Sequence, residues 1–301
     1  MYDLVTIGDI TVDLFFRGEE LTHKDGRLQL AIGGKYYTDF FHQGLGGSGG
    51  NVAVHGASLG LQTAVVAKVG EGALKNVIVQ GLVRKTVSTE FIYFEREYTS
   101  ISVILLMKSG ERTIIKHSDK KGHLVINPSA EERIQKSSII FLGNLPDVPI
   151  AERASLLGKL KTAENLVAVN FGSKDCKNGI KYLAPLLTHA DILFLNRYEL
   201  GDLIGVKGEK LNLKKNLKEK IKLLHTILVV TDGKNGSFAY TEGEVYYQEA
   251  AKAEKIVDTT GAGDAFTGAF LAKYKETTNI QKALEAGSIH AAGILSKVGA
   301  N

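Results

Sequence analysis

The sequence is poor in cysteine and in long apolar runs. Cys176 is the single cysteine in 301 residues, which excludes an internal disulfide framework. No apolar stretch approaches the roughly 20 residues that a membrane-spanning helix needs. The opening residues, MYDLVTIGDI, have neither the basic start nor the long apolar segment of a secretory signal. We therefore expect a cytoplasmic protein without a membrane partner.

An excess of charge of one sign is also missing. The 37 Lys and Arg residues nearly balance the 33 Asp and Glu residues, which leaves a formal net charge of +4. The lysines are dispersed and are densest at residues 210–222, as on a solvated helix face. This balance does not indicate a nucleic-acid partner. With 44% hydrophobic residues, the chain is long enough for one large core with a small appendage.

Short β-rich runs alternate with helical patterns along most of the chain. This alternation predicts an α/β fold with a doubly wound, mainly parallel sheet flanked by helices. The expected strands are residues 4–7, 64–69, 138–142, 166–170, 192–195 and 226–230. Helical spacing is clearest at residues 150–160 and 211–224.

Two segments interrupt the alternation. Residues 13–43 are rich in turn residues and aromatics, and residues 91–116 predict two strands joined by a turn at 108–111. Neither segment has enough strands to be stable by itself, so we expect both to form one small β lid. We expect the remaining residues, 1–12, 44–90 and 117–301, to form the core.

Both faces of the predicted lid strand at residues 101–107 are largely apolar. One face carries Ile101, Val103, Leu105 and Met107, and the other carries Ser102, Ile104 and Leu106. Large exposed apolar patches are rare on monomers, so both faces need cover. Residues 13–43 or the lid of a second subunit could supply it. We therefore predict a homodimer that associates through the lid.

The strongest chemical signal is the heptapeptide DTTGAGD at residues 258–264, which precedes a helical stretch. Gly261, Ala262 and Gly263 leave backbone N–H groups uncovered at the helix N-terminus, where anionic oxygens bind. Asp264, on the first turn, is placed to accept a proton from an attacking hydroxyl. A helix N-cap alone would explain an isolated Gly-x-Gly-Asp. The upstream aspartate and threonines favour phosphoryl transfer instead.

Other glycines suggest a different class of enzyme. Gly44, Gly46 and Gly49 satisfy the dinucleotide fingerprint of an NAD-dependent oxidoreductase. However, residues 39–43 are not a convincing buried strand, and no acid ends a second strand about 20 residues later. The chain also lacks a GxxxxGK[ST] loop, which excludes phosphate binding of the Walker type. The eight histidines show no metal-ligand spacing.

Two motifs resemble the signatures of the ribokinase-like, or PfkB, carbohydrate kinases. The N-terminal one is GGSGGNVA at residues 46–53, and the C-terminal one is DTTGAGDAFTGAF at residues 258–270. Further similarities lie at Leu59-Gly60, Val69-Gly70, Gly8-Asp9 to Asp13, Asn196 to Glu199 and Thr231 to Gly236. The resemblance therefore spans essentially the whole chain. It implies a ribokinase-like fold and ATP-dependent transfer of a phosphoryl group to an alcohol.

The resemblance also implies roles for single residues. Asp264 is implied to be the catalytic base, and the backbone of residues 261–263 is implied to form the anion hole. Both roles agree with the chemistry of these residues given above. Glu199 and Asn196 are implied to act on Mg²⁺ through water, and oxygen ligands suit this cation. The residues implied to contact ATP are Asn196, Thr231, Gly233 and Gly236. Asp258 and Thr260 resemble ligands of a monovalent cation such as K⁺.

The acceptor site is implied to contain Asp13, Gly46, Gly47, Asn51 and Asn144. A carboxylate that accepts from two hydroxyls, amides that donate and accept, and glycines that admit a ring suit a polyol.

The chain departs from the family at two places that bear on the acceptor. Residues 168–172 lack an expected arginine, and Asn144 stands where ribokinases have an acid. We expect a neutral sugar or sugar-like polyol as acceptor, with an adenosine-type nucleoside as the alternative because aromatic lid residues could cover a base. A phosphosugar ranks third because no cluster of Arg or Lys is evident. A kinase-fold binding protein without catalysis is the alternative from another class.

Overall fold

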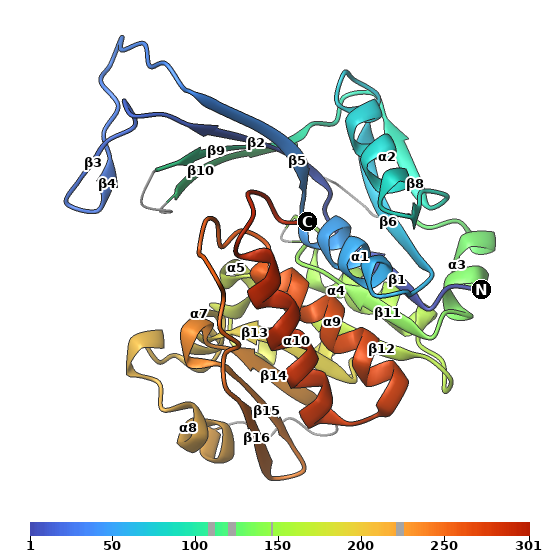
Figure 1. Ribbon diagram of the computed structural model, residues 1–301. Coiled ribbons are helices and arrows are strands. Elements are labelled where there is room, and N and C mark those ends of the chain that lie inside the picture. The colour runs from blue at the N-terminus through green and yellow to red at the C-terminus, as the bar shows by residue number, and fades with distance from the viewer. Residues whose placement is uncertain (108–111, 120–124, 146, 221–225) are drawn as a thin grey trace.

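The computed structural model describes residues 1–107, 112–119, 125–145, 147–220 and 226–301. Its centre is a large sheet (Figure 1). The strands of this sheet are β1 Leu4–Ile7, β6 Thr63–Gly70, β7 Val87–Ser88, β8 Ile92–Glu95, β11 Ile139–Leu142, β12 Leu166–Asn170, β13 Ile192–Asn196, β14 Ile227–Thr231, β15 Ser237–Thr241 and β16 Glu244–Gln248.

The strand order is β16-β15-β14-β13-β12-β11-β1-β6-β7, with β8 also paired to β6. β15 and β16 are antiparallel at one edge, and the other pairs are parallel. β1 and β11 are buried at every position, which explains their continuous apolar sequences. The predicted doubly wound, mainly parallel sheet is confirmed, and all six predicted strands lie in it.

Helices cover both faces of the large sheet. They are α1 Ser48–Ser58, α2 Lys75–Arg84, α3 Pro128–Gln135, α4 Ile150–Leu160, α5 Ser173–Cys176, α6 Ile180–Leu187, α7 Arg197–Ile204, α8 Leu213–Lys220, α9 Ala262–Thr277 and α10 Ile280–Ile294. In Figure 1, α1, α9 and α10 lie in front of the sheet. Leu4 packs into the cluster beneath these helices, whereas Val5 and Ile7 pack into the cluster that includes α4 and α6. None of the helices in the described ranges is long and apolar enough to cross a membrane.

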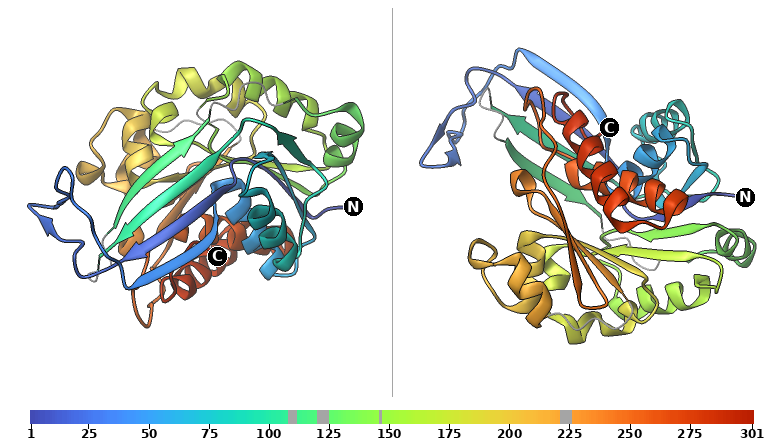
Figure 2. Two further views of the ribbon diagram at one scale, coloured as in Figure 1. Left: turned by 90° about the horizontal axis from the view of Figure 1, so that it is seen from above. Right: turned by 60° about the horizontal axis from the view of Figure 1, so that its bottom comes forward.

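A separate small sheet lies above the large one in Figure 1 and is seen from above in the left view of Figure 2. Its strands are β2 Thr11–Arg17, β5 Phe40–Gly46, β9 Ser100–Leu106 and β10 Arg112–Ser118, in the order β10-β9-β2-β5. β2 and β9 are parallel, and the other neighbours are antiparallel. The short strands β3 His23–Lys24 and β4 Arg27–Leu28 form a hairpin between β2 and β5.

The small sheet draws on the two segments expected to form a lid, with different boundaries. Its strands begin at Thr11 and extend to Gly46 and Ser118. β8 instead pairs in parallel with the end of β6, where its apolar residues find a partner in the large sheet. The turn expected at residues 108–111 lies outside the described residues.

The two faces of β9 are covered differently. Ile104 and Leu106 are each only 1% exposed and face the interior of the molecule. Val103, on the opposite face, is partly exposed. Phe15 of β2 stands beside Ile104 and is fully buried, so the chain itself covers the Ile104 face. The apolar surface that remains accessible is therefore the Val103 face.

Candidate active site

Several predicted site residues lie where neighbouring parallel strands end. Asn196 ends β13 and Thr231 ends β14, and the two residues are paired in register. Asn144 lies just after β11, and Gly172 follows β12. A Cβ on Gly172 would lie 2.5 Å from the Asn144 amide nitrogen, so these loops meet closely. Ligands of open α/β sheets bind at this edge.

The first turn of α9 forms an open backbone surface. Gly261 is its N-cap, with φ of 77°, and a Cβ there would lie 2.5 Å from the Ala300 Cβ. Glycine is therefore required at this position. A Cβ on Gly263 would have no neighbouring atom within 4 Å, so the backbone there faces open space. Because the first N–H groups of a helix lack helical acceptors, this turn can bind an anion.

Asp264 lies on this turn, and its Oδ2 accepts a hydrogen bond from Asn51 Nδ2 at 2.8 Å. Burial raises the pKa of the Asp264 carboxyl to about 6, the Asn51 hydrogen bond lowers it, and the charge of Asp13 raises it further. A carboxylate with this pKa is charged at neutral pH and can still accept a proton during a reaction. The structure thus brings together Asn51 and Asp264, the predicted base, which belong to separate motifs.

Asp13 lies on β2, close enough to Asp264 for its charge to act on that carboxyl. It is 6% exposed, and Thr11 Oγ1 donates to its Oδ1 at 2.8 Å. Burial raises the pKa of the Asp13 carboxyl. A Cβ on Gly46 would lie 2.2 Å from Asp13 Oδ2, and one on Gly47 would lie 2.4 Å from the Asp9 carbonyl oxygen. The absence of a side chain at Gly46 and Gly47 therefore makes room for other groups of the protein. The sequence predicts that these glycines make room for the acceptor ring.

Glu199 and Asn196 form a capping box at the start of α7. Asn196 Oδ1 accepts from the backbone N–H groups of Tyr198 and Glu199 at 2.9 Å, and Glu199 Oε2 accepts from Asn196 N at 2.8 Å. Burial raises the pKa of the Glu199 carboxyl to about 7, and the charges of Asp264 and Asp202 contribute. A carboxylate crowded by other acids favours a nearby cation.

The described part of the chain contains no group of three or more His, Cys, Asp or Glu side chains that could hold a metal ion by themselves. Proteins usually bind Mg²⁺ through one or two carboxylates together with substrate phosphates and water, which requires no such group. Glu199 is the carboxylate for which the sequence predicts this role.

The loop between β14 and β15 is held close to α7. Asp232 N donates to the Gly236 carbonyl at 2.8 Å, and Arg197 Nε donates to Asp232 Oδ1 at 2.6 Å. Gly236 has φ of 92°, and a Cβ there would meet the Gln248 carbonyl at 2.1 Å. Gly233, with φ of 53°, faces open space. The loop therefore leaves the backbone at Gly233 open near the strand ends, where the sequence predicts contact with a nucleotide.

Asp258 organises the loop that precedes α9. Its Oδ1 accepts from the Thr260 backbone N–H at 2.9 Å and from the Thr260 hydroxyl at 2.7 Å. Its Oδ2 accepts from Gly299 N at 3.1 Å. The Asp258 side chain is thus used internally, and a monovalent cation at Asp258 and Thr260 stays a prediction.

Two cationic side chains that the sequence reasoning missed reach the site from β10. Lys116 Nζ lies 2.8 Å from Asp9 Oδ2, and Arg112 Nη1 donates to the Thr259 hydroxyl. The Arg112 Nε lies 4.0 Å from Asp258 Oδ1. Residues 112 and 116 share one face of the strand because side chains alternate with a period of two. Two basic residues four positions apart on a predicted strand are the signal in the sequence from which this pair could have been predicted.

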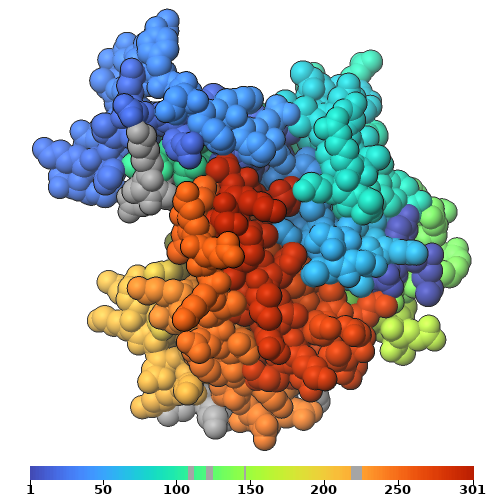
Figure 3. All heavy atoms as spheres, viewed as in Figure 1, coloured from blue at the N-terminus to red at the C-terminus, as the bar shows by residue number. Residues whose placement is uncertain are grey.

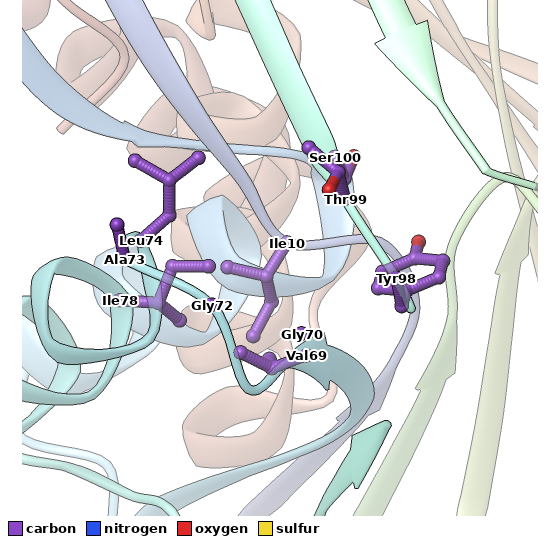
Figure 4. Close-up of a pocket in the computed structure, with 10 residues that line it drawn as sticks. All are labelled: Ile10, Val69, Gly70, Gly72, Ala73, Leu74, Ile78, Tyr98, Thr99 and Ser100. Atoms are coloured by element: carbon purple, nitrogen blue, oxygen red, sulfur yellow. The ribbon is translucent and has the colours of Figure 1, made fainter. Parts of the chain in front are cut away.

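Figure 3 shows a hollow between the small sheet and the core. A separate cavity of about 60 Å³ lies at the start of β9 (Figure 4). It is lined by Ile10, Val69, Gly70, Gly72, Ala73, Leu74, Ile78, Tyr98, Thr99 and Ser100. Ligand pockets are usually about 300–1,000 Å³, so this cavity is too small for a nucleotide or sugar. The candidate site is therefore placed by the residues at the start of α9 and not by this cavity.

Comparisons with known proteins identify the family of the chain. The ATP-dependent 6-phosphofructokinase of Thermoanaerobacterium thermosaccharolyticum is 24% identical over 307 residues, covering 99% of this chain and 89% of that protein. The probable fructokinase-5 of Arabidopsis thaliana is 28% identical over 238 residues, covering 75% of this chain and 72% of that protein.

The fold is also similar to the structure of Arabidopsis thaliana ribokinase complexed with ribose and ATP. The TM-score is 0.82 at 24% identity, over 99% of this chain and 94% of that chain. The family described as pfkB family carbohydrate kinase matches residues 1–301. Because this match spans the whole chain, the protein belongs to the pfkB family of carbohydrate kinases.

Proposed function

We propose that this kinase transfers the γ-phosphoryl group of ATP to a hydroxyl of a small neutral sugar or sugar-like polyol. The observation that carries the proposal is the Asp264 carboxylate, held by Asn51 at 2.8 Å on the open first turn of α9. A base and a set of backbone donors side by side are what transfer to a hydroxyl needs.

The chemistry follows from these groups. The acceptor O–H proton passes to Asp264 as the hydroxyl oxygen forms a bond to the γ-phosphorus of ATP. The bond from that phosphorus to the β–γ bridging oxygen breaks, and ADP leaves. The backbone N–H groups at residues 261–263 stabilise charge on the transferred phosphoryl group, because they are oriented before the reaction begins. Asp13, near the base, accepts hydrogen bonds from acceptor hydroxyls.

Glu199 is the residue that would hold Mg²⁺, together with the phosphates of ATP and with water that Asn196 helps to order. The ion supplies positive charge that balances the phosphates. The raised pKa of Glu199, caused first by burial, supports this assignment because a cation would restore its charged form. Asn196, Thr231, Gly233 and Gly236 are proposed to contact the nucleotide. Potassium at Asp258 and Thr260 remains a hypothesis.

The inner face of the small sheet bears on the choice of acceptor. Phe15 is fully buried and offers no accessible ring to a nucleoside base, whereas Phe40 on the same face is partly exposed, so a nucleoside stays an alternative. Lys116 and Arg112 favour a second candidate, a phosphosugar, and a relative is named a 6-phosphofructokinase. However, Lys116 is paired with Asp9, and Arg112 lies beside Asp258. Because aspartates already balance both cations, a neutral acceptor stays first.

The test is release of ADP from wild-type protein, ATP and Mg²⁺ with separate neutral sugars, nucleosides and phosphosugars. Acceptor-dependent ADP with a neutral sugar or polyol supports the proposal. Activity only with a nucleoside or a phosphosugar would replace the acceptor class. No acceptor-dependent ADP, despite measurable ATP binding, would favour a non-catalytic binding protein.

Self-association through the small sheet is a further part of the proposal. Val103 shares the outer face with Ile115, which is 56% exposed. Ile104 cannot test this interface because it is buried on the inner face. Light scattering should give a dimer for the wild type and a monomer for Ile115→Lys. The matched control is Ile256→Lys, at a 64% exposed isoleucine outside the sheet, and it should remain dimeric. A monomeric wild type would contradict the proposed dimer.

A further inference from the structure

Residues 299–301 lie against the catalytic groups although they belong to none of the motifs. The C-terminal end of the described chain lies beside β5 and the start of α1 (Figure 1). Asn301 Nδ2 donates to Asn51 Oδ1 at 2.8 Å and to the Leu45 carbonyl at 3.2 Å. Asn51 Nδ2 in turn donates to Asp264 Oδ2 at 2.8 Å. A continuous chain of hydrogen bonds therefore runs from Asn301 to the base.

The donor direction in this chain is set at both ends. The Asp264 carboxylate can only accept, so Asn51 must present its nitrogen to it and its oxygen to Asn301. The Leu45 carbonyl also only accepts, so the same Asn301 nitrogen uses one hydrogen for Leu45 and the other for Asn51. Asn301 thus supplies the donor that satisfies the oxygen end of the Asn51 amide.

The segment that carries Asn301 is fixed by several other contacts. Gly299 N donates to Asp258 Oδ2 at 3.1 Å, and Ala300 is 1% exposed against Gly261. The Ala300 carbonyl lies 2.8 Å from His55 Nε2. Burial lowers the pKa of His55 to about 4, so the neutral ring donates from Nε2, and its Nδ1 accepts from His290 at 3.0 Å. Asn301 is therefore held by the loop before α9, by the N-cap of α9 and by α1, the helix that carries Asn51.

We infer that Asn301 is a positioning residue that orients Asn51 and, through it, the base Asp264. The inference rests on the proposed function of Asp264. Without the donor from Asn301, the Asn51 oxygen loses its partner and the amide is free to rotate away from the carboxylate. Hydrogen-bonded networks of this kind act as units, so loss of one member weakens the next bond. A weaker bond from Asn51 favours the protonated form of Asp264.

The charged groups around Asp264 define what a titration reports. Asp13 from β2 raises the pKa of Asp264, and the Asp264 charge in turn raises that of Glu199 on α7. Asn51 from α1 is the neutral group that lowers the Asp264 pKa. Asn301→Leu leaves both acids in place and adds no charge, so a change in the titration of Asp264 in this variant reports the Asn51 hydrogen bond.

The experiment compares Asn301→Leu and Asn301→Asp with wild type in pH profiles of kcat, at saturating ATP, Mg²⁺ and acceptor. Leucine has a similar size but no donor, and aspartate adds a negative charge. We expect kcat near pH 6 to fall about tenfold in Asn301→Leu. The acidic limb of the kcat profile should move to higher pH in both variants, and it should move further in Asn301→Asp than in Asn301→Leu. The loss should shrink as pH rises, and the KM for ATP should stay unchanged.

Lys297→Ala is the matched control, because Lys297 is exposed in the same segment, and its profile should equal that of wild type. A parallel loss of kcat at every pH, or no loss, would overturn the inference.

A second measurement does not depend on catalysis. The ¹³C carboxyl resonance of Asp264, assigned with Asp264→Asn, should titrate at higher pH in Asn301→Leu than in wild type. An unchanged midpoint would also overturn the inference. If wild type transfers no phosphoryl group to any acceptor, the proposed function fails, whereas this titration still decides whether Asn301 acts on Asp264.

Discussion

The start of α9 and the inner face of the small sheet approach the same site but are held differently. At α9, Gly261 touches Ala300 so closely that no methyl group fits between them. On the small sheet, Lys116 and Arg112 reach the core through long side chains, and the Lys116 side chain is 48% exposed. Close packing resists any rearrangement, whereas partly exposed ion pairs exchange partners at low cost. Catalysis should therefore depend far more on the α9 side.

The largest effect should come from Asp264→Asn. Asparagine keeps the size and the polar character of the side chain but cannot act as a base, so turnover should fall on the order of 10² to 10⁴. Acceptor-dependent ADP release measures it, and an unchanged thermal unfolding curve shows that the fold is intact. Turnover near that of wild type would rule out Asp264 as the base.

Gly261→Ala should have the next largest effect. A side chain at φ of 77°, 2.5 Å from the Ala300 Cβ, strains the backbone and should cost about 1–3 kcal/mol of unfolding free energy. Turnover should fall about 10- to 100-fold because the anion hole is displaced. Urea unfolding and ADP release measure the two effects.

The matched variant for this prediction is Gly263→Ala, whose methyl group enters open space. It should leave the unfolding free energy unchanged and weaken phosphate binding only. Equal loss of stability in both variants would show that the two glycines do not differ as described.

The pH dependence of the reaction follows from the Asp264 pKa of about 6, raised chiefly by burial. The base acts when deprotonated, so kcat/KM should be constant above this pH and fall about tenfold per unit below it. Glu199 also titrates in the absence of a cation, and Mg²⁺ would shift its titration to lower pH. Profiles at two Mg²⁺ concentrations separate the groups. An acidic limb that follows only the Mg²⁺ concentration would contradict the assignment to Asp264.

The smallest effect should come from the small sheet. Lys116→Gln removes a partly exposed ion pair with Asp9, which is worth about 0–1 kcal/mol. The KM for a neutral acceptor should rise no more than about threefold, with kcat unchanged, and the difference should fade at high salt. Steady-state kinetics at low and high salt measure this. A loss of kcat above tenfold would place Lys116 in the chemistry and remove the contrast with α9.

The sequence was enough to predict those parts of the molecule that depend on local patterns. The buried strands are continuous apolar runs. The motif at residues 258–264 contains both the uncovered backbone and the candidate base within seven residues. Asn51 and Asp264 were assigned from separate motifs, and the structure joins them. The fold class and family could therefore be predicted before any contact was known.

Contacts between distant side chains could not be predicted. Arg112 meets Thr259 from 147 positions away, and Asn301 meets Asn51 from 250 positions away. No local pattern encodes such pairs, because they depend on how the small sheet and the last residues pack on the core. The close approach of Gly46 to Asp13 was likewise hidden, since the motif shows that a side chain is absent but not which group takes its place.

The central claim is that an acceptor hydroxyl attacks the γ-phosphorus of ATP. The most direct measurement uses the best neutral acceptor with ¹⁸O in the hydroxyl groups and analyses the product by mass spectrometry and ³¹P NMR. We predict a sugar or polyol phosphate whose bridging oxygen is ¹⁸O, formed in equal amount to ADP. Formation of ADP with inorganic phosphate and no ester would contradict this claim.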